Sequence, residues 1–495
     1  MTGKSNVTTQ TRSSISARRR HSLRQYFAID GGSGAHLLAA LGGYSPYLRP
    51  VASPRHADLL IIVAPISQKL VPAIVEIAQA LPQPAHVLLI HEPTGELAGS
   101  SEVTIVDSKT LFRDVRSITT SLAEEVFQAI SDTAPWAELA LKDSTVQDTE
   151  TIQLPSKQEQ EMATELVVLS LGPIQPFTAG PLRIFLICDG EQVLSAQVES
   201  GYAQRGISRA MMQTGWQQSL NLARSLDPLA PIAGQLAYVR AIEQIQNWQP
   251  SPPMVVLREA ALALERARNQ LWWLVRFMRL LADVQLGDRA YQLATSFETS
   301  LTQLWHLQPA TWILPQWQGK IECNEPAIVQ LKQLADAVEA FNTAIKRNRW
   351  FALRTRGIGV LPTLLLKDSD ISDAVLQENE LGKGDVLSRL VNCTLRAVTD
   401  LRNTANMLSN NVSPVAHTEN WTLPGGEAQV TVAGLRGQIG LHLNSDGGEK
   451  PAHVEWQSLS ASLLSLLPEI LAGQKLADAE IILASLNLAM AEADG

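Results

Sequence analysis

The stretch Asp58-Leu-Leu-Ile-Ile-Val-Ala64, with the residues that follow it, decides the fold of the first part of the chain. This apolar run predicts a buried strand, and residues 70–81 carry apolar side chains at helical spacing until Pro82 ends the helix. His86-Val-Leu-Leu-Ile90 predicts a second strand. Strands without polar alternation are typical of a parallel sheet with helices on both faces. We therefore expect a small parallel-sheet α/β domain over residues 26–131.

The segments that flank this domain are polar. Residues 1–25 hold six basic side chains and no acid, and no apolar segment follows the arginine pair there, so an export signal is not expected. We expect a flexible basic tail, which either has no role or contacts anionic lipid. Residues 132–162 are rich in charged and polar side chains and predict an interdomain linker.

Residues 163–495 predict a second, larger domain. Apolar runs at 166–171 and 182–188 flank a turn rich in glycine and proline, which indicates a small antiparallel sheet. Long helical patterns follow over about residues 257–282, 326–346 and 385–408, and their apolar stripes predict a helical bundle. The fold class expected for the whole chain is α/β plus α+β.

Composition limits the function. The chain has 495 residues, of which 45% are hydrophobic and 18% charged, so it can form a sizeable core. No apolar run reaches the ~20 residues that cross a bilayer. The net charge of −9 argues against nucleic acid as a partner. The three cysteines are far apart and form no C-x-x-C pair, which indicates a reducing cytoplasm and neither disulfides nor a thiolate metal site.

Two segments of the first domain resemble a known protein family. Ile29-Asp-Gly-Gly-Ser-Gly-Ala-His36, followed by Ser53-Pro-Arg-His-Ala-Asp-Leu-Leu-Ile-Ile-Val-Ala-Pro65, is similar to the small, cluster-bearing subunit of respiratory complex I and of energy-converting membrane-bound hydrogenases. The family pattern there is D-x-G-G-C-x-x-C, then S-P-R-H-A-D and a strand.

The second domain resembles the partner of that subunit, the nickel–iron hydrogenase large subunit and its complex I counterpart. The segments that carry the likeness include Gly172-Pro-Ile-Gln-Pro176, Gly201-Tyr-Ala-Gln-Arg-Gly-Ile207, Arg356-Gly-Ile-Gly359, Leu435-Arg-Gly437 and residues 466–478. The resemblance implies that both subunits are fused in one chain. It also implies that residues 33–36 face residues 172–180 and 201–206.

The positions that bind cofactors in the family carry other residues here. The first three cluster cysteines correspond to Ser33, His36 and Pro93, and the fourth has no counterpart. The first nickel-binding pair corresponds to Asp227 and Ala230, and residues 486–490 near the chain end contain no cysteine. Two histidines of the quinone segment are replaced by Gln175 and Ala179. Soft thiolates hold iron–sulfur clusters, so the resemblance implies neither cluster nor nickel, and no catalytic residue.

Several charged residues are expected to be structural. Glu265 and Arg266 lie on the first long helix, and Arg205, Arg356 and Arg436 each adjoin a glycine in these motifs. In the family such arginines brace the interface between the subunits. We expect them to form ion pairs rather than to act in catalysis.

Former cluster positions also offer metal ligands. His36, His91 and Glu92 fall at or beside positions that converge in the family, and two imidazoles with a carboxylate can hold zinc with an open fourth position. The alternative is that these histidines are hydrogen-bonded or exposed and bind nothing.

The sequence thus favours a peripheral subunit without redox activity on the cytoplasmic face of a complex I-like membrane complex. It would cap antiporter-like integral membrane subunits of an ion-translocating arm. The alternatives are a subunit of a quinone- or NADH-linked oxidoreductase complex, and a zinc site that supports bicarbonate or proton chemistry.

Overall fold

The computed structural model describes residues 24–44, 48–63, 66–82, 86–90, 115–117, 166–281, 283–305, 312–314, 324–361, 384–409 and 421–495. The expected linker, most of the basic tail, Pro93 and the zinc candidates His91 and Glu92 lie outside these residues. The predictions that concern them remain predictions.

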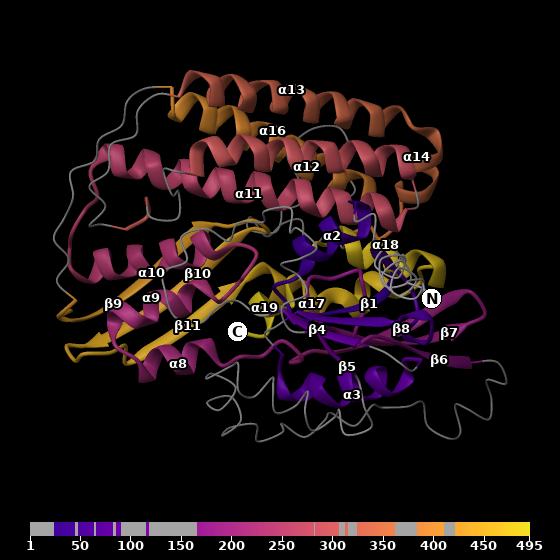
Figure 1. Ribbon diagram of the computed structural model, residues 1–495. Helices are drawn as coiled ribbons and strands as arrows, with labels where there is room; N and C mark the ends of the chain where they lie inside the picture. Colours follow the sequence, from indigo (N-terminus) through magenta and orange to yellow (C-terminus); the bar gives the residue numbers. More distant parts are fainter. Residues whose placement is uncertain are drawn as a thin grey trace, which may run out of the picture.

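The first part of the described chain contains a five-stranded sheet with helices between its strands (Figure 1). Its strands are β1 (Arg24–Asp30), β2 (Leu48–Pro50), β3 (Leu59–Val63), β4 (His86–Ile90) and β5 (Val115–Ser117), in the order β2-β1-β3-β4-β5. The first four strands pair in parallel, as was expected for the two strands that the sequence predicted, β3 and β4. The strands β1, β2 and β5 were not predicted, and β5 is antiparallel to β4.

The continuous apolar run of β3 is explained by burial on both faces. Leu60 and Ile62 pack in one apolar cluster with Ile74 of α3 (Val71–Ala80). Leu59 and Ile61 pack in another cluster, which includes Leu41 of α2 (Ala35–Tyr44). Successive side chains of a strand point to opposite faces, so a strand between two helices needs apolar residues at every position.

Two three-stranded antiparallel sheets belong to the later part of the chain. The first contains β6 (Leu166–Leu171), β7 (Arg183–Asp189) and β8 (Gln192–Glu199), and its β6–β7 pair was expected. The second contains β9 (Gly425–Ala433), β10 (Gln438–Asp446) and β11 (His453–Ser458), with β10 in the centre. The sequence interpretation missed β8 and the second sheet, because their strands carry many polar residues on the outer face.

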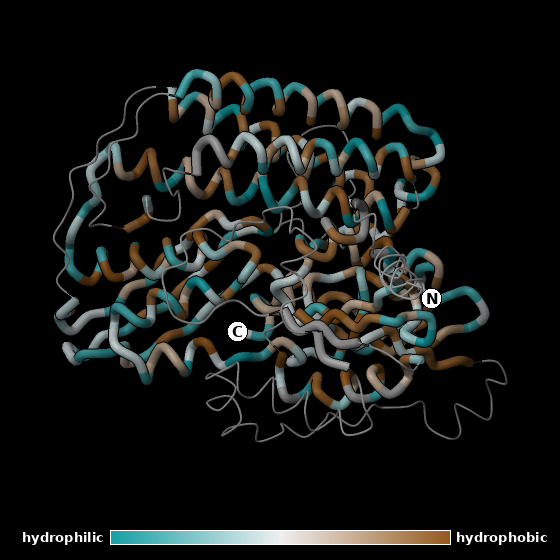
Figure 2. The backbone as a smooth tube through the Cα atoms, viewed as in Figure 1, coloured by the Kyte–Doolittle hydropathy of each residue, from teal (hydrophilic) through white to brown (hydrophobic). Residues whose placement is uncertain are grey.

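The helical bundle consists of four long helices, and the sequence predicted three of them. They are α11 (Pro252–Leu280), α12 (Val284–Trp305), α13 (Glu325–Arg347) and α16 (Val386–Met407), of which α12 was missed. Asn324 and Asp385 cap α13 and α16 by accepting backbone N–H groups. Hydrophilic and hydrophobic residues succeed one another within the turns of α13, as expected for an amphipathic helix with one buried face (Figure 2).

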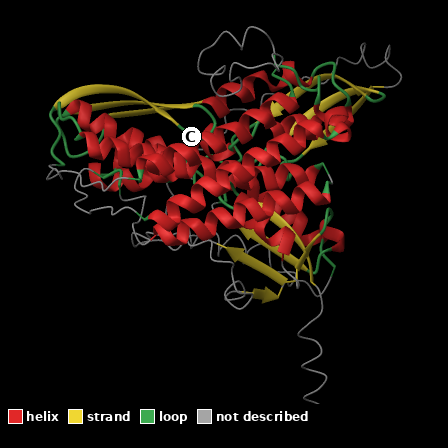
Figure 3. Ribbon diagram, turned by 90° about the horizontal axis from the view of Figure 1, so that it is seen from above, coloured by secondary structure: helices red, strands yellow, loops and turns green. Residues whose placement is uncertain are grey.

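Shorter helices connect the sheets with the bundle. They are the 3₁₀ helices η2 (Pro54–His56) and η3 (Gln68–Leu70), and α8 (Ile207–Gln213), α9 (Trp216–Arg224), α10 (Pro231–Ile245), α14 (Arg349–Thr355), α17 (Leu459–Leu471), α18 (Leu476–Ser485) and α19 (Met490–Ala493). The three sheets lie at the periphery of the helices (Figure 3). One large apolar core joins the bundle to both antiparallel sheets. None of the helices described is long and apolar enough to cross a membrane.

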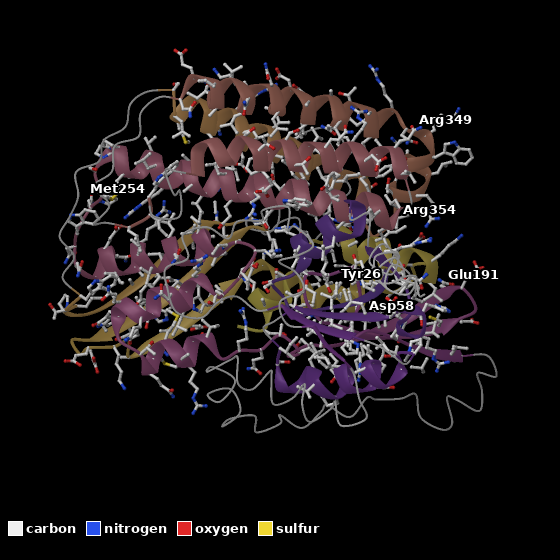
Figure 4. All side chains as sticks on the ribbon, in the orientation of Figure 1. Tyr26, Asp58, Glu191, Met254, Arg349 and Arg354 are labelled. Carbon is white, nitrogen blue, oxygen red and sulfur yellow. The ribbon has the colours of Figure 1, made fainter. Side chains whose placement is uncertain are left out.

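The end of the bundle at α14 has an exposed surface. Trp350 is 81% exposed and Leu353 is 72% exposed. Arg349 and Arg354 extend from the same short helix (Figure 4). Arg356, which follows α14, is also exposed, so the expectation that it braces a buried interface was wrong. The glycine beside it has a positive φ, and the chain turns there at the surface.

Candidate functional site

The α/β part of the chain docks on the later part through polar contacts at residues 67–69. The hydroxyl of Ser67 donates to the carbonyl of Tyr202. Lys69 donates to the carbonyl of Ser200 at 2.8 Å and pairs with Glu199 at 3.0 Å. The Lys69 ammonium also lies 4.4 Å from the centroid of the Tyr202 ring, a cation–π contact.

A backbone contact joins the turn after β1 to the 172–180 segment. A Cβ on Gly180 would lie 3.2 Å from the Cα of Gly32 and 3.1 Å from the Cβ of Met490. Gly180 has a φ of +96°, so glycine serves both the close approach and the conformation. Ala35, Ala179 and Leu229 form a small apolar cluster beside this contact. Gly32 and Ala35 thus lie beside Gly180 and Ala179, which agrees with part of the docking expected from the sequence. Tyr202, in the second expected stretch, packs instead with residues 66–70.

Asp30 holds the turn of residues 31–34, which the sequence resemblance compares with a cluster-binding segment. One oxygen of its carboxylate accepts the N–H groups of Gly32 at 2.9 Å and Gly34 at 2.7 Å. Burial raises the pKa of Asp30, and these N–H groups and the nearby Arg276 oppose the rise. Ser33 lies in this turn and is partly exposed. The turn therefore keeps its shape through carboxylate and backbone contacts.

His36 is buried against α11. Its Nε2 lies 2.5 Å from Oδ1 of Asn269, and its ring centroid lies 6.3 Å from that of Trp272. Burial, and then the charge of Arg268, lower the pKa of His36 to about 3, so the imidazole is neutral near pH 7. Its Nδ1 is buried and has no hydrogen-bond partner among the described residues.

Asp227, the residue expected at the first nickel-ligand position, contacts an arginine that is buried between two acids. Nη1 of Arg436 donates to Asp227 and, at 3.0 Å, to Glu492. Nε of Arg436 donates at 2.6 Å to the carbonyl of Asn487. Asp227 precedes α10, and Asn487 and Glu492 belong to the C-terminal segment, so two stretches distant in the sequence meet at Arg436. We call Arg436, Asp227 and Glu492 the arginine–carboxylate cluster.

Glu265 of α11 holds the start of α10, directly after Ala230. Its two carboxylate oxygens accept the N–H groups of Ile232 at 2.6 Å and Ala233 at 3.1 Å. These are N–H groups that a helix leaves without a partner at its first turn. Burial raises the pKa of Glu265 to about 8, and the two donated hydrogen bonds oppose the rise. Glu265 is thus structural, as expected.

Two of the arginines expected to be structural also hold parts of the chain together. Arg266 of α11 pairs with Asp400 of α16 at 2.7 Å, and this ion pair joins two helices of the bundle. Arg205 donates to the carbonyl of Leu226 at 2.9 Å. That contact ties the segment before α8 to the stretch that carries Asp227.

Hydrogen bonds connect His36 with the arginine–carboxylate cluster. Nδ2 of Asn269 donates to the carbonyl of Leu229 at 2.6 Å, and the N–H of Leu229 donates to Asp227 at 3.0 Å. Because Asn269 also contacts His36, a continuous path runs from His36 through Asn269 and Leu229 to the arginine–carboxylate cluster. Neither Asn269 nor Glu492 was singled out in the sequence, because each acquires its role through a partner distant in the chain.

Residues 172–180, which the sequence resemblance compares with a quinone-binding segment, are held by side-chain and backbone hydrogen bonds. Nε2 of Gln175 donates to the carbonyl of Leu182 at 3.0 Å. The N–H of Ala179 donates to the carbonyl of Leu488 at 3.0 Å, and its carbonyl accepts from the N–H of Met490 at 2.9 Å. Ala179 offers only a methyl group at a position for which the sequence resemblance implies a histidine. This segment therefore braces the C-terminal segment.

A small cavity adjoins the arginine–carboxylate cluster on the side of α16. It has a volume of about 60 Å³, and its polar lining includes Arg389, Arg396 and Arg436. Burial lowers the pKa of Arg389 to about 10, although this arginine still carries its charge near pH 7. Arg389 donates to the hydroxyl of Ser485 and to the carbonyl of Gly359, which joins α16 to α18.

The pKa values of two buried acids predict how stability depends on pH. Burial raises the pKa of Glu265 to about 8 and that of Glu492 to about 7, both from about 4.5. Above pH ~4.5 and up to the raised pKa of each acid, the folded chain therefore binds more protons than the unfolded chain. The free energy of unfolding therefore falls as the pH rises through this window. His36, with a lowered pKa, acts in the opposite sense below pH ~6.5.

We therefore expect the free energy of unfolding to fall between pH 6.5 and pH 8, by about 1 to 2 kcal/mol from Glu265 alone. Urea titrations across this range, on wild type and Glu265→Gln, measure it, and the variant should have a shallower slope. Glu76→Gln, at an exposed position on α3, is the control. Equal slopes in wild type and Glu265→Gln would contradict this assignment.

The chain is similar to subunits of NADH-quinone oxidoreductases, and its last part matches a family model. Residues 369–495 match the family model described as respiratory-chain NADH dehydrogenase, 49 Kd subunit. An NADH-quinone oxidoreductase subunit of Chloroflexus aurantiacus is 26% identical over 414 residues, which cover 70% of this chain and 100% of that protein. NADH-quinone oxidoreductase subunit 4 of Thermus thermophilus is 22% identical over 69% of this chain and 97% of that protein.

A solved structure shares the fold. A chain of the membrane-bound sulfane sulfur reductase, an archaeal respiratory membrane complex, matches with a TM-score of 0.54 and 20% identity. The match covers 67% of this chain and 99% of that chain. The chain therefore contains a region similar to a large subunit of complex I, and about a third of the chain lies outside the structural match.

Proposed function

We propose that this chain is a peripheral subunit of a complex I-like membrane complex and takes part without redox chemistry of its own. The arginine–carboxylate cluster is the observation that carries the proposal. Asp227 there is engaged by Arg436 and by the N–H of Leu229. Cys393 lines the neighbouring cavity, but burial raises the pKa of its thiol to about 12, so it is protonated. A nickel–iron centre needs several soft thiolate ligands, so these donors do not fit it.

The α/β part is the counterpart of a cluster-bearing small subunit, fused to the large-subunit-like region. Its contacts at Lys69, His36 and Gly32 support this arrangement, because they are made with the large-subunit-like part of the same chain. An iron–sulfur cluster does not fit at Ser33 and His36 either. Ser33 and His36 offer no thiolate, and His36 already bonds Asn269.

The polar path from His36 to Arg436 takes the place of a redox relay. It joins the turn after β1 to the C-terminal segment through groups that all have defined partners, so a shift at one end disturbs the bonds at the other. Such a path can transmit a conformational or proton-linked signal to the membrane arm. The proposed partners are antiporter-like integral membrane subunits, which would hold this chain on the cytoplasmic face of the membrane.

We expect the purified complex to contain neither iron–sulfur nor nickel stoichiometric with this chain. Anaerobic purification followed by elemental analysis and acid-labile sulfide assay measures this. Stoichiometric nickel, or iron with sulfide, assigned to this chain would refute the proposal. That result would favour the alternative of a quinone- or NADH-linked oxidoreductase subunit with its own redox centre.

The zinc alternative at the former cluster position is supported by one observation. The Nδ1 of His36 is buried, has no described hydrogen-bond partner, and belongs to a neutral imidazole, as a zinc ligand must be. The same elemental analysis tests it. Zinc that is lost in both His36→Ala and His91→Ala would support a site for bicarbonate or proton chemistry, and its retention in both would exclude one.

An exposed apolar surface near the quinone-like segment is suited to docking on a membrane subunit. Val168 of β6 is 41% exposed and Leu194 of β8 is 45% exposed. Both strands belong to the sheet that flanks residues 172–182. Exposed apolar groups of this kind on a sheet edge are typical of sites that another protein covers. The basic tail supplies a few kcal/mol at most to an anionic surface, so it assists and does not anchor.

We expect Val168→Glu together with Leu194→Glu to release the chain from membranes, because the pair places two charges in the proposed contact. Sedimentation of native membranes under gentle detergent extraction, with the chain detected in pellet and supernatant, measures this. Val329→Glu is the matched control, since Val329 is 50% exposed on α13 of the bundle. Deletion of residues 1–25 should have a modest effect. Full retention of the double variant would contradict this docking surface.

A further inference from the structure

The outer face of the β9–β11 sheet carries polar side chains that neither the fold nor the proposed function uses. In β10, Leu441 and Leu443 point into the core, and His442 and Asn444 point outward. In β11, Val454 is buried, and His453 and Glu455 are exposed. Strand alternation thus gathers two histidines and a glutamate on one face of two neighbouring strands.

The strand register brings these groups together. His442 and Glu455 are directly opposite each other in the antiparallel β10–β11 pair. His453 lies two residues before Glu455, on the same face, and the centroids of the two imidazole rings are 5.6 Å apart. Directly opposite pairs have Cβ atoms ~5 Å apart, and diagonal neighbours are also within reach.

The ligand atoms of the three side chains lie within 4.8 Å of one another. Nδ1 of His442 is 3.9 Å from Oε2 of Glu455, and Nε2 of His453 is 3.8 Å from the same oxygen. Ligand atoms around a tetrahedral zinc ion are ~3.3 Å apart, so small rotamer changes of these partly exposed side chains suffice. We propose that His442, His453 and Glu455 form a zinc-binding site on this sheet.

Glu427 of β9 orients the first ligand. Its carboxylate accepts a hydrogen bond from Nε2 of His442, because an ionised carboxylate can only accept. This places the proton of His442 on Nε2 and leaves the lone pair of Nδ1 for the metal. A carboxylate behind a metal-binding histidine is a frequent arrangement, and it fixes both ring orientation and tautomer. Glu427 is therefore a positioning residue.

The donor set favours zinc over magnesium and calcium. Two imidazoles and one carboxylate suit zinc, and they leave the fourth position open to water or another ligand. Magnesium and calcium prefer oxygen ligands throughout, so they should compete poorly. The ion would cross-link β10 and β11 and, through Glu427, tie in β9. It should therefore stabilise the sheet that packs against α10.

Equilibrium dialysis of the full chain, with any affinity tag removed, against buffered zinc tests the site. We expect one zinc that is lost in His442→Gln combined with His453→Gln, and an affinity lowered ~10-fold to 100-fold in Glu427→Gln. Zinc should also raise the melting temperature of wild type and not that of the double variant. All these side chains are on the surface, so the variants should fold, which circular dichroism verifies.

Two controls separate this site from others. His56→Gln removes an exposed histidine of η2 and should leave zinc binding unchanged. His36→Ala tests the former cluster position, and zinc retained in that variant but lost in the double variant assigns the ion to the sheet. If the double variant binds zinc with unchanged stoichiometry and affinity, the proposal is wrong. This result is independent of the proposed membrane function.

Discussion

Arg436→Met is expected to lower the free energy of unfolding by about 3 to 5 kcal/mol, because it leaves two buried carboxylates without their cation. The side chains of Arg436, Asp227 and Glu492 are all almost completely buried. The variant also loses the hydrogen bond to the carbonyl of Asn487, which ties the turn between β9 and β10 to the C-terminal segment. Urea unfolding followed by tryptophan fluorescence measures the loss.

Two further variants test the origin of this effect. Arg402→Met removes an arginine of α16 whose partners Asp336 and Glu339 are exposed, and it should leave the unfolding midpoint nearly unchanged. Adding Asp227→Asn and Glu492→Gln to Arg436→Met removes the uncompensated charges and should recover much of the stability. If Arg436→Met unfolds at the wild-type urea concentration, the cluster does not hold the site together.

Gly234→Ala is expected to destabilise the chain by about 1 to 3 kcal/mol through overpacking between α9 and α10. A Cβ at Gly234 would lie 2.4 Å from the carbonyl oxygen of Ala223, a backbone atom that cannot rotate away. The helices would have to separate. The loop between them carries Asp227, so the arginine–carboxylate cluster should be disturbed as well, and thermal unfolding should show a lower midpoint.

Gly287→Ala is the matched control. Gly287 lies within α12, and a Cβ there would meet nothing within 4 Å. Alanine has the higher helix propensity, so this variant should gain about 0.5 to 1 kcal/mol. Two glycine-to-alanine changes in helices should thus have opposite signs. A similar loss in both variants would show that helix packing at Ala223 is not the cause.

A strand buried on both faces can be predicted from the sequence more readily than a strand with one polar face. The run at β3 was predictable because burial on both faces demands apolar residues at every position, a pattern visible without knowledge of partners. The strands β9 and β10 were missed. Their outer faces carry residues such as His442 and Glu427, and whether such a segment pairs depends on strands distant in the sequence.

The sequence by itself determined the parallel pairing of β3 with β4 and three of the four long helices described in the bundle. It also determined which residue types stand at the positions that the resemblance compares with ligands. These features follow from local periodicity and residue chemistry. The tertiary structure alone decided that Asp227 meets Arg436 and Glu492, that His36 bonds Asn269, and that His442 lies beside His453. The first two contacts join residues more than 200 positions apart, and the third depends on strand register, so no local pattern encodes them.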